Sequence, residues 1–265
     1  MARQLVQCTL PHSDPGDVRQ WSRTNGALTL RIRPDFDRKT DQALFPYGSI
    51  PRLLLFWIVT EAKQRKTRRL RLGNSLDAFM REVGLNPRTG GGKRSDANRL
   101  REQMRRLFRA TISFEDLRDN HDRWIDMQIA PKADLWWDVN HVAQDNLFDS
   151  WIELGETFYE AVTESAVPVD LRALRALKRS PLALDLYAWL TYTAFVATRN
   201  TAPRVVPWEG LYAQMGAEYA ELRQFRANVQ LALKKIRIVY PGLKLDLSQT
   251  TLTVHPSRTA ISSKP

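Results

Sequence analysis

Apolar and polar positions follow one pattern in two parts of the chain, residues 75–84 (SLDAFMREVG) and 207–216 (PWEGLYAQMG). In both, the spacing predicts a short helix that ends at a glycine, Gly84 or Gly216. The corresponding apolar positions are Leu76 with Trp208, Phe79 with Leu211, Met80 with Tyr212, and Val83 with Met215. A repeat of this kind indicates two related structural units.

Longer helices are predicted on both sides of each copy. An apolar helix begins at a proline before each copy, over residues 51–66 and 181–198. A basic amphipathic helix follows each copy, over residues 95–109 and 219–238. Alternating segments then predict strand pairs at residues 111–114 with 124–129 and at 243–247 with 251–255. This is the order of a winged helix. We therefore expect an α+β, mostly α, fold with tandem winged-helix domains, each a helical core with a β-hairpin wing.

These elements divide the chain into two domains. The first covers residues 27–165, including an acidic connector, and the second covers residues 166–256. Leu100 and Phe225 are expected at equivalent core positions. Turn and breaker residues predict a flexible N-terminal segment over residues 1–26, and residues 257–265 are expected to form a flexible tail.

The outer faces of the two basic helices carry the candidate DNA contacts. Reading bases in the major groove needs a helix that presents Arg, Lys, Asn or Gln near its start. The candidates are Lys93, Arg94, Asn98, Arg101, Arg105 and Arg109 in the first unit, and Arg223, Gln224, Ala227 and Lys234 in the second. Such a face is also typical of a helix that is merely solvated. Glu102 would repel phosphates unless it pairs with Arg106 or accepts a hydrogen bond from cytosine.

Charge is segregated along the chain in step with the repeat. The 265 residues carry a formal net charge of +11. Residues 61–110 hold 15 Lys and Arg against 5 Asp and Glu, and residues 171–265 hold 14 against 5. The segment between them, residues 111–170, holds 3 against 14. Two basic modules joined by an acidic connector favour a polyanionic partner such as duplex DNA. We expect the acidic segment to stay off that DNA.

The sequence offers no motif for catalysis, a cofactor or a metal ion. The glycine-rich loop has Arg94 where a phosphate-binding Walker loop needs Ser or Thr. The four histidines lack metal-ligand spacing. Cys8 is the only cysteine, which excludes an intrachain disulfide and fits a reducing bacterial cytoplasm. The apolar runs are too short to cross a bilayer. We therefore expect a non-enzymatic protein that needs neither cofactor nor metal.

Three stretches resemble the RepA family of bacterial plasmid replication initiators. They are FPYGSIPRLLLFWIVTEA from Phe45, RLGNSLDAFMREVGL from Arg71, and TGGGKRSDANRLREQMRRLFRATISFE from Thr89. The resemblance is dense from Phe45 to Glu115 and looser to about residue 240. It implies a replication initiator that binds repeated sequences, called iterons, at a plasmid origin and melts an adjacent AT-rich region with host help.

The resemblance also implies the partners, which are duplex origin DNA and host replication proteins, namely the host initiator and the replicative helicase. It supplies no catalytic residues, and it leaves open whether the chain acts as a monomer or a homodimer. An alternative hypothesis is a winged-helix transcriptional repressor, including one that represses its own promoter, because the same two modules would support that function.

Overall fold

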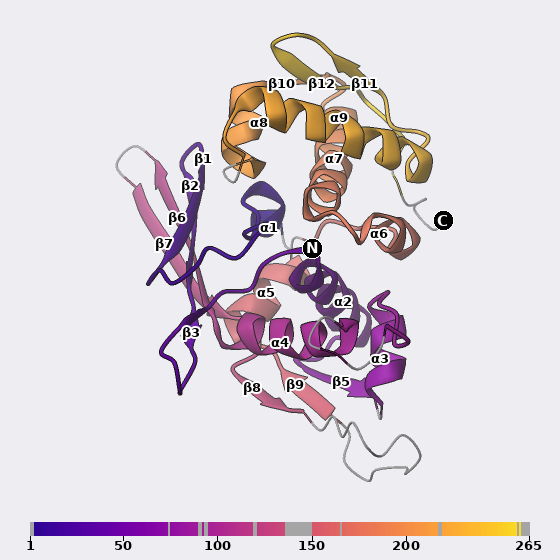
Figure 1. Ribbon diagram of the computed structural model, residues 1–265. Helices are drawn as coiled ribbons and strands as arrows, with labels where there is room; N and C mark the ends of the chain where they lie inside the picture. Colours follow the sequence, from indigo (N-terminus) through magenta and orange to yellow (C-terminus); the bar gives the residue numbers. More distant parts are fainter. Residues whose placement is uncertain are drawn as a thin grey trace.

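The computed structural model describes residues 3–73, 75–89, 92, 95–118, 121–135, 150–164, 166–216, 219–258 and 260 (Figure 1). The fold mixes helices and strands, with helices predominating as the sequence predicted. The two basic helices lie in different halves of the molecule. One half contains α4 and the other α9, and the N-terminal helix α1 lies between them in Figure 1.

Two long helices form the centre of the C-terminal half, α7 (Pro181–Arg199) and α9 (Leu222–Val239). Pro181 stands in the first turn of α7, where its missing N–H costs no hydrogen bond, and the hydroxyl of Ser180 accepts from the Ala183 N–H at 3.1 Å. Between the helices lie β10 (Arg204–Pro207) and α8 (Trp208–Met215). After α9, β11 (Leu245–Leu247) and β12 (Thr251–Val254) complete an antiparallel sheet in the order β10-β12-β11.

The same order of elements occurs in the N-terminal half. It runs through α2 (Ser49–Arg65), β5 (Arg69–Gly73), α3 (Leu76–Glu82), α4 (Asp96–Arg109), β6 (Thr111–Arg118) and β7 (His121–Gln128). The hydroxyls of Ser75 and Ser95 cap α3 and α4 by accepting backbone N–H bonds. Leu100 on α4 and Phe225 on α9 are both fully buried, as predicted for core positions.

The strand pairing differs between the two halves. In the C-terminal half, β10 pairs with the hairpin that follows α9. In the N-terminal half, β5 instead pairs with β9 (Ser150–Glu153), which pairs with β8 (Lys132–Asp134). The hairpin β6–β7 joins β2 (Leu28–Arg33) and β1 (Trp21–Asn25) in a four-stranded sheet of order β1-β2-β6-β7. The expected first wing is therefore the outer part of a larger sheet.

Helices and a short hairpin fill the remaining described parts of the chain. The hairpin consists of β3 (Asp35–Phe36) and β4 (Ala43–Leu44) and leads into α2. The helices α5 (Glu156–Glu164) and α6 (Leu171–Leu177) connect β9 to α7. No described helix is both long and apolar enough to cross a membrane.

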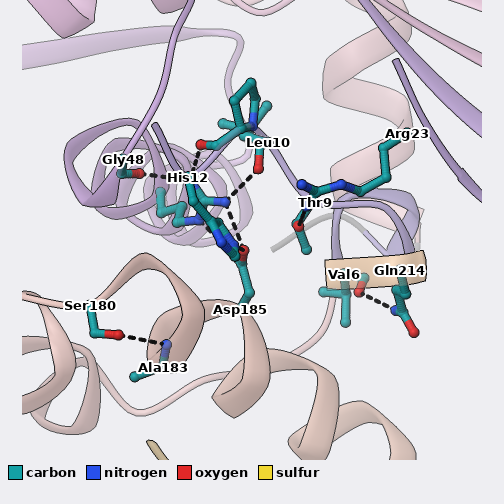
Figure 2. Close-up of polar contacts among 12 residues, drawn as sticks. Val6, Thr9, Leu10, His12, Arg23, Gly48, Ser180, Ala183, Asp185 and Gln214 are labelled. Carbon is teal, nitrogen blue, oxygen red and sulfur yellow. Dashed lines mark hydrogen bonds and ion pairs between the residues drawn. The ribbon is translucent and has the colours of Figure 1, made fainter. Parts of the chain in front are cut away.

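The predicted flexibility of the first 26 residues is wrong for the described part of that segment. Residues 3–26 contain α1 (Arg3–Gln7) and all of β1, and Leu5, Val6 and Cys8 are buried in the core. The side-chain amide of Gln214 on α8 donates to the Val6 carbonyl at 3.2 Å (Figure 2). Breaker residues such as Pro11 and Gly16 suggested a loose segment, but the partners that order it lie far along the chain, where local sequence patterns cannot reveal them.

The start of the predicted tail is also ordered. The hydroxyl of Ser257 donates to the His255 carbonyl at 2.7 Å, and its backbone N–H donates to the Thr198 hydroxyl at 3.0 Å. The Tyr240 hydroxyl donates to the Arg258 carbonyl at 2.6 Å. Residues 259 and 261–265 lie outside the described residues.

A buried ion pair joins the two halves. Arg52 on α2 and Asp185 on α7 are 1% and 2% exposed, and two hydrogen bonds of 2.7 Å connect the guanidinium to the carboxylate. His12 Nε2 lies 2.9 Å from Asp185 Oδ2 (Figure 2). The remaining guanidinium N–H groups of Arg52 donate to the carbonyls of Leu10, Pro11 and Gly48. This junction thus connects α2, α7 and the N-terminal segment through one fully bonded arginine.

Candidate nucleic-acid interface

The helix α9 has one buried face and one open face. Phe225, Val229, Ala232, Leu233 and Ile236 recur at helical spacing and pack into the core. The positions between them that the sequence singled out, Arg223, Gln224, Ala227 and Lys234, are all exposed. Among the described residues, no side chain forms an ion pair or a hydrogen bond with the side chains of Arg223, Gln224 or Lys234. These donors are therefore available to an external partner.

The start of α9 is fixed against the turn between β11 and β12. The Trp208 indole N–H donates to the Ser248 carbonyl at 3.1 Å. The guanidinium of Arg226 lies over the Trp208 ring, 5.3 Å from its centroid, and Nη2 donates to the same carbonyl at 3.5 Å. Arg226 was not among the residues predicted from the sequence to contact DNA. The helical period predicts that Arg226 lies beside the buried residues of α9. It does not predict the contacts of Arg226 with the Trp208 ring and the Ser248 carbonyl.

The helix α4 presents a different surface, because acidic residues from the β3–β4 hairpin face it. Arg109 Nε lies 3.1 Å from Asp35 Oδ2, and Arg105 Nη1 lies 3.9 Å from Asp37 Oδ2. Both arginine side chains are nearly half exposed. Hydrogen bonds from the backbone N–H groups of Lys39 and Thr40 lower the pKa of Asp37, so it remains charged opposite Arg105.

Other candidate residues of α4 also have internal partners. The side-chain amide of Asn98 donates to the Gly92 carbonyl at 3.0 Å, and Arg101 is half-buried. Arg106, the predicted alternative partner of Glu102, is buried and donates to the Phe45 carbonyl at 3.1 Å. Its Nη2 bonds Glu102 Oε1 at 2.5 Å, so the predicted alternative of an internal pair for Glu102 is confirmed. Lys93 and Arg94 lie outside the described residues.

The structure thus brings four predicted residues together on one uncovered face of α9, and it places those of α4 among internal partners. Both helices are amphipathic, which explains why the sequence predicted a DNA-binding face on each of them. The described residues contain no group of His, Cys, Asp and Glu side chains suited to hold a metal ion. What this arrangement can do chemically is bind an anionic, hydrogen-bonding surface through α9.

The hairpin β6–β7 adds a feature that was not predicted from the sequence. Trp124 on β7 is 70% exposed, which is unusual for an indole side chain. In the register of the sheet it stands opposite Glu115, and Arg31 on β2 pairs with that glutamate at 2.9 Å. Exposed aromatic rings on a sheet can stack on bases. Here the neighbouring charges balance, so Trp124 is a secondary candidate.

The chain is similar to known proteins both in sequence and in fold. A family model described as plasmid-encoded RepA protein matches residues 45–210, which is more than half of the chain. The match includes α4 and ends within α8, before α9. No curated protein sequence matches the chain.

Two solved structures are similar to the whole chain. They are the crystal structure of RctB domains 2–3, with a TM-score of 0.56, and that of selenomethionine derivatives of domain 2 and domain 3 of RctB, with a TM-score of 0.58. Each is 12% identical in sequence, and each alignment covers 95% of both chains. At this identity the likeness concerns the fold, and it extends over both halves.

Proposed function

Because the chain belongs to the family of plasmid-encoded RepA proteins, we propose that it is a plasmid replication initiator that binds iterons in the duplex DNA of a plasmid origin. Binding then promotes opening of that origin. In this proposal the two sets of elements are tandem winged helices, and the protein acts by binding rather than by catalysis, without a cofactor, in the bacterial cytoplasm.

The observation that carries the proposal is the uncovered face of α9. Arg223 and Gln224 stand in the first turn, and Ala227 and Lys234 continue the same exposed surface. Arginine and glutamine can each make paired hydrogen bonds to a base edge in the major groove, and the groove is wide enough for one helix. The turn between β11 and β12, fixed beside α9 through Ser248, is then placed to approach the neighbouring phosphates.

In this proposal the helix α4 has a smaller part in DNA binding than α9. Asp35 and Asp37 compete with phosphates for Arg105 and Arg109, so α4 contributes less to affinity than α9 does. Origin opening is assigned to the host partners, the initiator and the replicative helicase, which are recruited to the DNA-bound chain. The family resemblance supports this division of work, because it implies that the origin is melted with host help.

A binding assay with the full chain tests the proposal. Gel shifts compare a duplex that carries the repeats beside the gene with a shuffled duplex of equal length. We expect preference for the repeats, and Arg223→Ala should weaken it by roughly 5- to 150-fold if the side chain reads a base. If Arg223 contacts phosphate, the log–log salt dependence should instead flatten by about 0.9. Arg199→Ala on α7 also removes an exposed positive charge and should change neither quantity.

Equal binding to the repeats and to the shuffled duplex would contradict sequence-specific recognition. A second measurement separates an initiator from a repressor. Permanganate reactivity of thymines in a supercoiled origin plasmid, with host initiator and helicase present, should rise when the protein is added. Tight binding at the chain's own promoter, with no rise in reactivity at the origin, would instead indicate a transcriptional repressor.

A further inference from the structure

The open face of α9 contains two apolar side chains among its polar residues. Ala227 and Leu231 are one turn apart and both exposed, and Leu231 is 57% exposed. Around Ala227 the surface forms a hollow of about 270 Å³, lined by Arg223, Arg226, Ala227 and Gln230. The methyl group of Ala227 is the only aliphatic group among these four that ends at its Cβ, so it forms the floor of the hollow.

The side chains that line this hollow differ in how firmly they are held. Arg226 is held by the Trp208 ring and the Ser248 carbonyl, which fixes one wall. Among the described residues, no side chain forms an ion pair or a hydrogen bond with the side chains of Arg223 or Gln230, so these two can turn toward a ligand. The hollow therefore combines an apolar floor, one fixed wall and two mobile polar walls.

This chemistry matches one base edge of the major groove. Thymine alone among the four DNA bases presents a methyl group there, beside its O4 acceptor, and alanine is a common apolar partner of that methyl. Cytosine carries only a hydrogen at the corresponding carbon, and the purines present N7 with O6 or the N6 amino group, so thymine alone can fill an apolar floor with a methyl group. Any larger side chain at position 227 would fill the space that the methyl needs.

We infer that Ala227 is a specificity-determining residue that reads a thymine through its 5-methyl group, while Arg223 and Gln224, one turn earlier, read adjoining guanine and adenine edges. This inference rests on the proposed function, because it assumes that α9 enters the major groove. It adds that each half-site read by α9 contains a thymine that the protein recognises by its methyl group alone.

Replacement of thymine by deoxyuridine tests this directly, since it removes only the methyl. The probes are duplexes selected from a random pool by the full wild-type chain, with each thymine replaced in turn. At one position we expect a loss of affinity of about fourfold, the effect of one methyl removed from an apolar contact. In Ala227→Gly, the thymine and deoxyuridine duplexes should bind equally at that position.

Glycine also weakens an exposed helix relative to alanine, so a matched control is needed. Ala176 is an exposed alanine on α6, and Ala176→Gly should keep the full sensitivity to deoxyuridine. The readout is the ratio of affinities for two probes within each variant, which partial unfolding of the protein does not change.

The possible outcomes separate this inference from the proposed function. A selected duplex in which no thymine is sensitive would overturn the methyl contact and leave the initiator proposal standing. Sensitivity that persists in Ala227→Gly would assign the methyl to another residue and overturn the role of Ala227. Failure of the wild-type chain to select any duplex would overturn sequence-specific binding and the inference with it.

Discussion

Asp185 shows how strongly one residue of this protein depends on its surroundings. Burial alone would raise the pKa of its carboxyl group, but the charge of Arg52 and the hydrogen bond from His12 lower that pKa to about 2. The carboxylate therefore stays charged inside the core. Removing one partner of such a pair leaves a buried charge uncompensated, which is far more costly than the pair itself is stabilising.

His12, at the same junction, predicts how stability depends on pH. Burial lowers its pKa below the usual value of about 6.5, and the charge of Arg52 adds to this effect against the opposing hydrogen bond with Asp185. The folded chain thus favours the neutral ring. Below about pH 6.5 the unfolded chain binds a proton at this histidine more readily than the folded chain does. The free energy of unfolding should therefore decrease as the pH is lowered through this range.

The measurement is urea unfolding between pH 7 and pH 5 for the wild type and His12→Gln. We expect the free energy of unfolding to decline in this window for the wild type, and the variant should decline less. His255, which lies 2.6 Å from Asp246 on the surface, contributes equally to both proteins and cancels in the comparison. Identical pH profiles for the two proteins would show that His12 is not held neutral.

At the scale of elements, the β3–β4 hairpin limits what α4 can contribute. Substituting both Asp35 and Asp37 by Asn removes the two carboxylates opposite Arg109 and Arg105. If the freed arginines reach phosphates, binding to the origin duplex should tighten, and the log–log salt dependence should steepen by up to about 0.9 for each arginine. Both quantities come from one titration of the full chain at several salt concentrations.

The control for this double substitution is Asp41→Asn. Asp41 lies beside the same hairpin but pairs with Arg19 at 3.8 Å, not with a residue of α4. This substitution removes one negative charge from the same region and should leave the salt dependence unchanged. A slope that stays constant in the double variant as well would mean that α4 lies away from the DNA.

Elements were predicted well wherever the information is local. The helical periods and the serine caps placed α3, α4, α7 and α9 within a few residues of their observed ends. The exposed face of α9 followed from the same period. The sequence also predicted an open basic face on α4. In the structure Asp35 and Asp37 face the arginines of α4, and these aspartates come from a hairpin about 70 residues earlier in the chain, so the helical period could not reveal them. A helical period records which face is polar and does not record what covers that face.

The pairing of strands that are distant along the chain could likewise not be predicted from the sequence. The segments of β6 and β7 were recognised by their alternation, yet nothing local distinguishes a hairpin that stands alone from one that joins β2. The ion pair between Arg52 and Asp185 joins residues 133 positions apart and has no sequence signature. The superposition of the two halves as equivalent winged helices stays a prediction.

At the scale of the whole molecule, the N-terminal segment makes the two halves one unit. His12 contacts Asp185 in the C-terminal half, while Leu10 and Pro11 accept hydrogen bonds from Arg52 in the N-terminal half. Val6 accepts a bond from Gln214 on α8. A fragment that starts near residue 170 would lose these contacts, so experiments on DNA binding are best made with the full chain.

Cys8 allows the central claim, that α9 lies in the major groove of the repeats, to be measured directly. Burial raises the pKa of this only cysteine to about 11, and its side chain is fully buried, so a thiol reagent should not reach it. Gln230→Cys places one reactive thiol on the open face of α9. Lys63→Cys, on the exposed part of α2, is the matched control.

Iron–EDTA tethered to that thiol cuts DNA within its short reach. With the full chain bound to the origin duplex, Gln230→Cys should cut both strands at one place in each repeat, flanking a major groove. The wild type and Lys63→Cys should give no local cutting. Cutting from Lys63→Cys with none from Gln230→Cys would contradict the claim, because it would place α2 rather than α9 against the DNA.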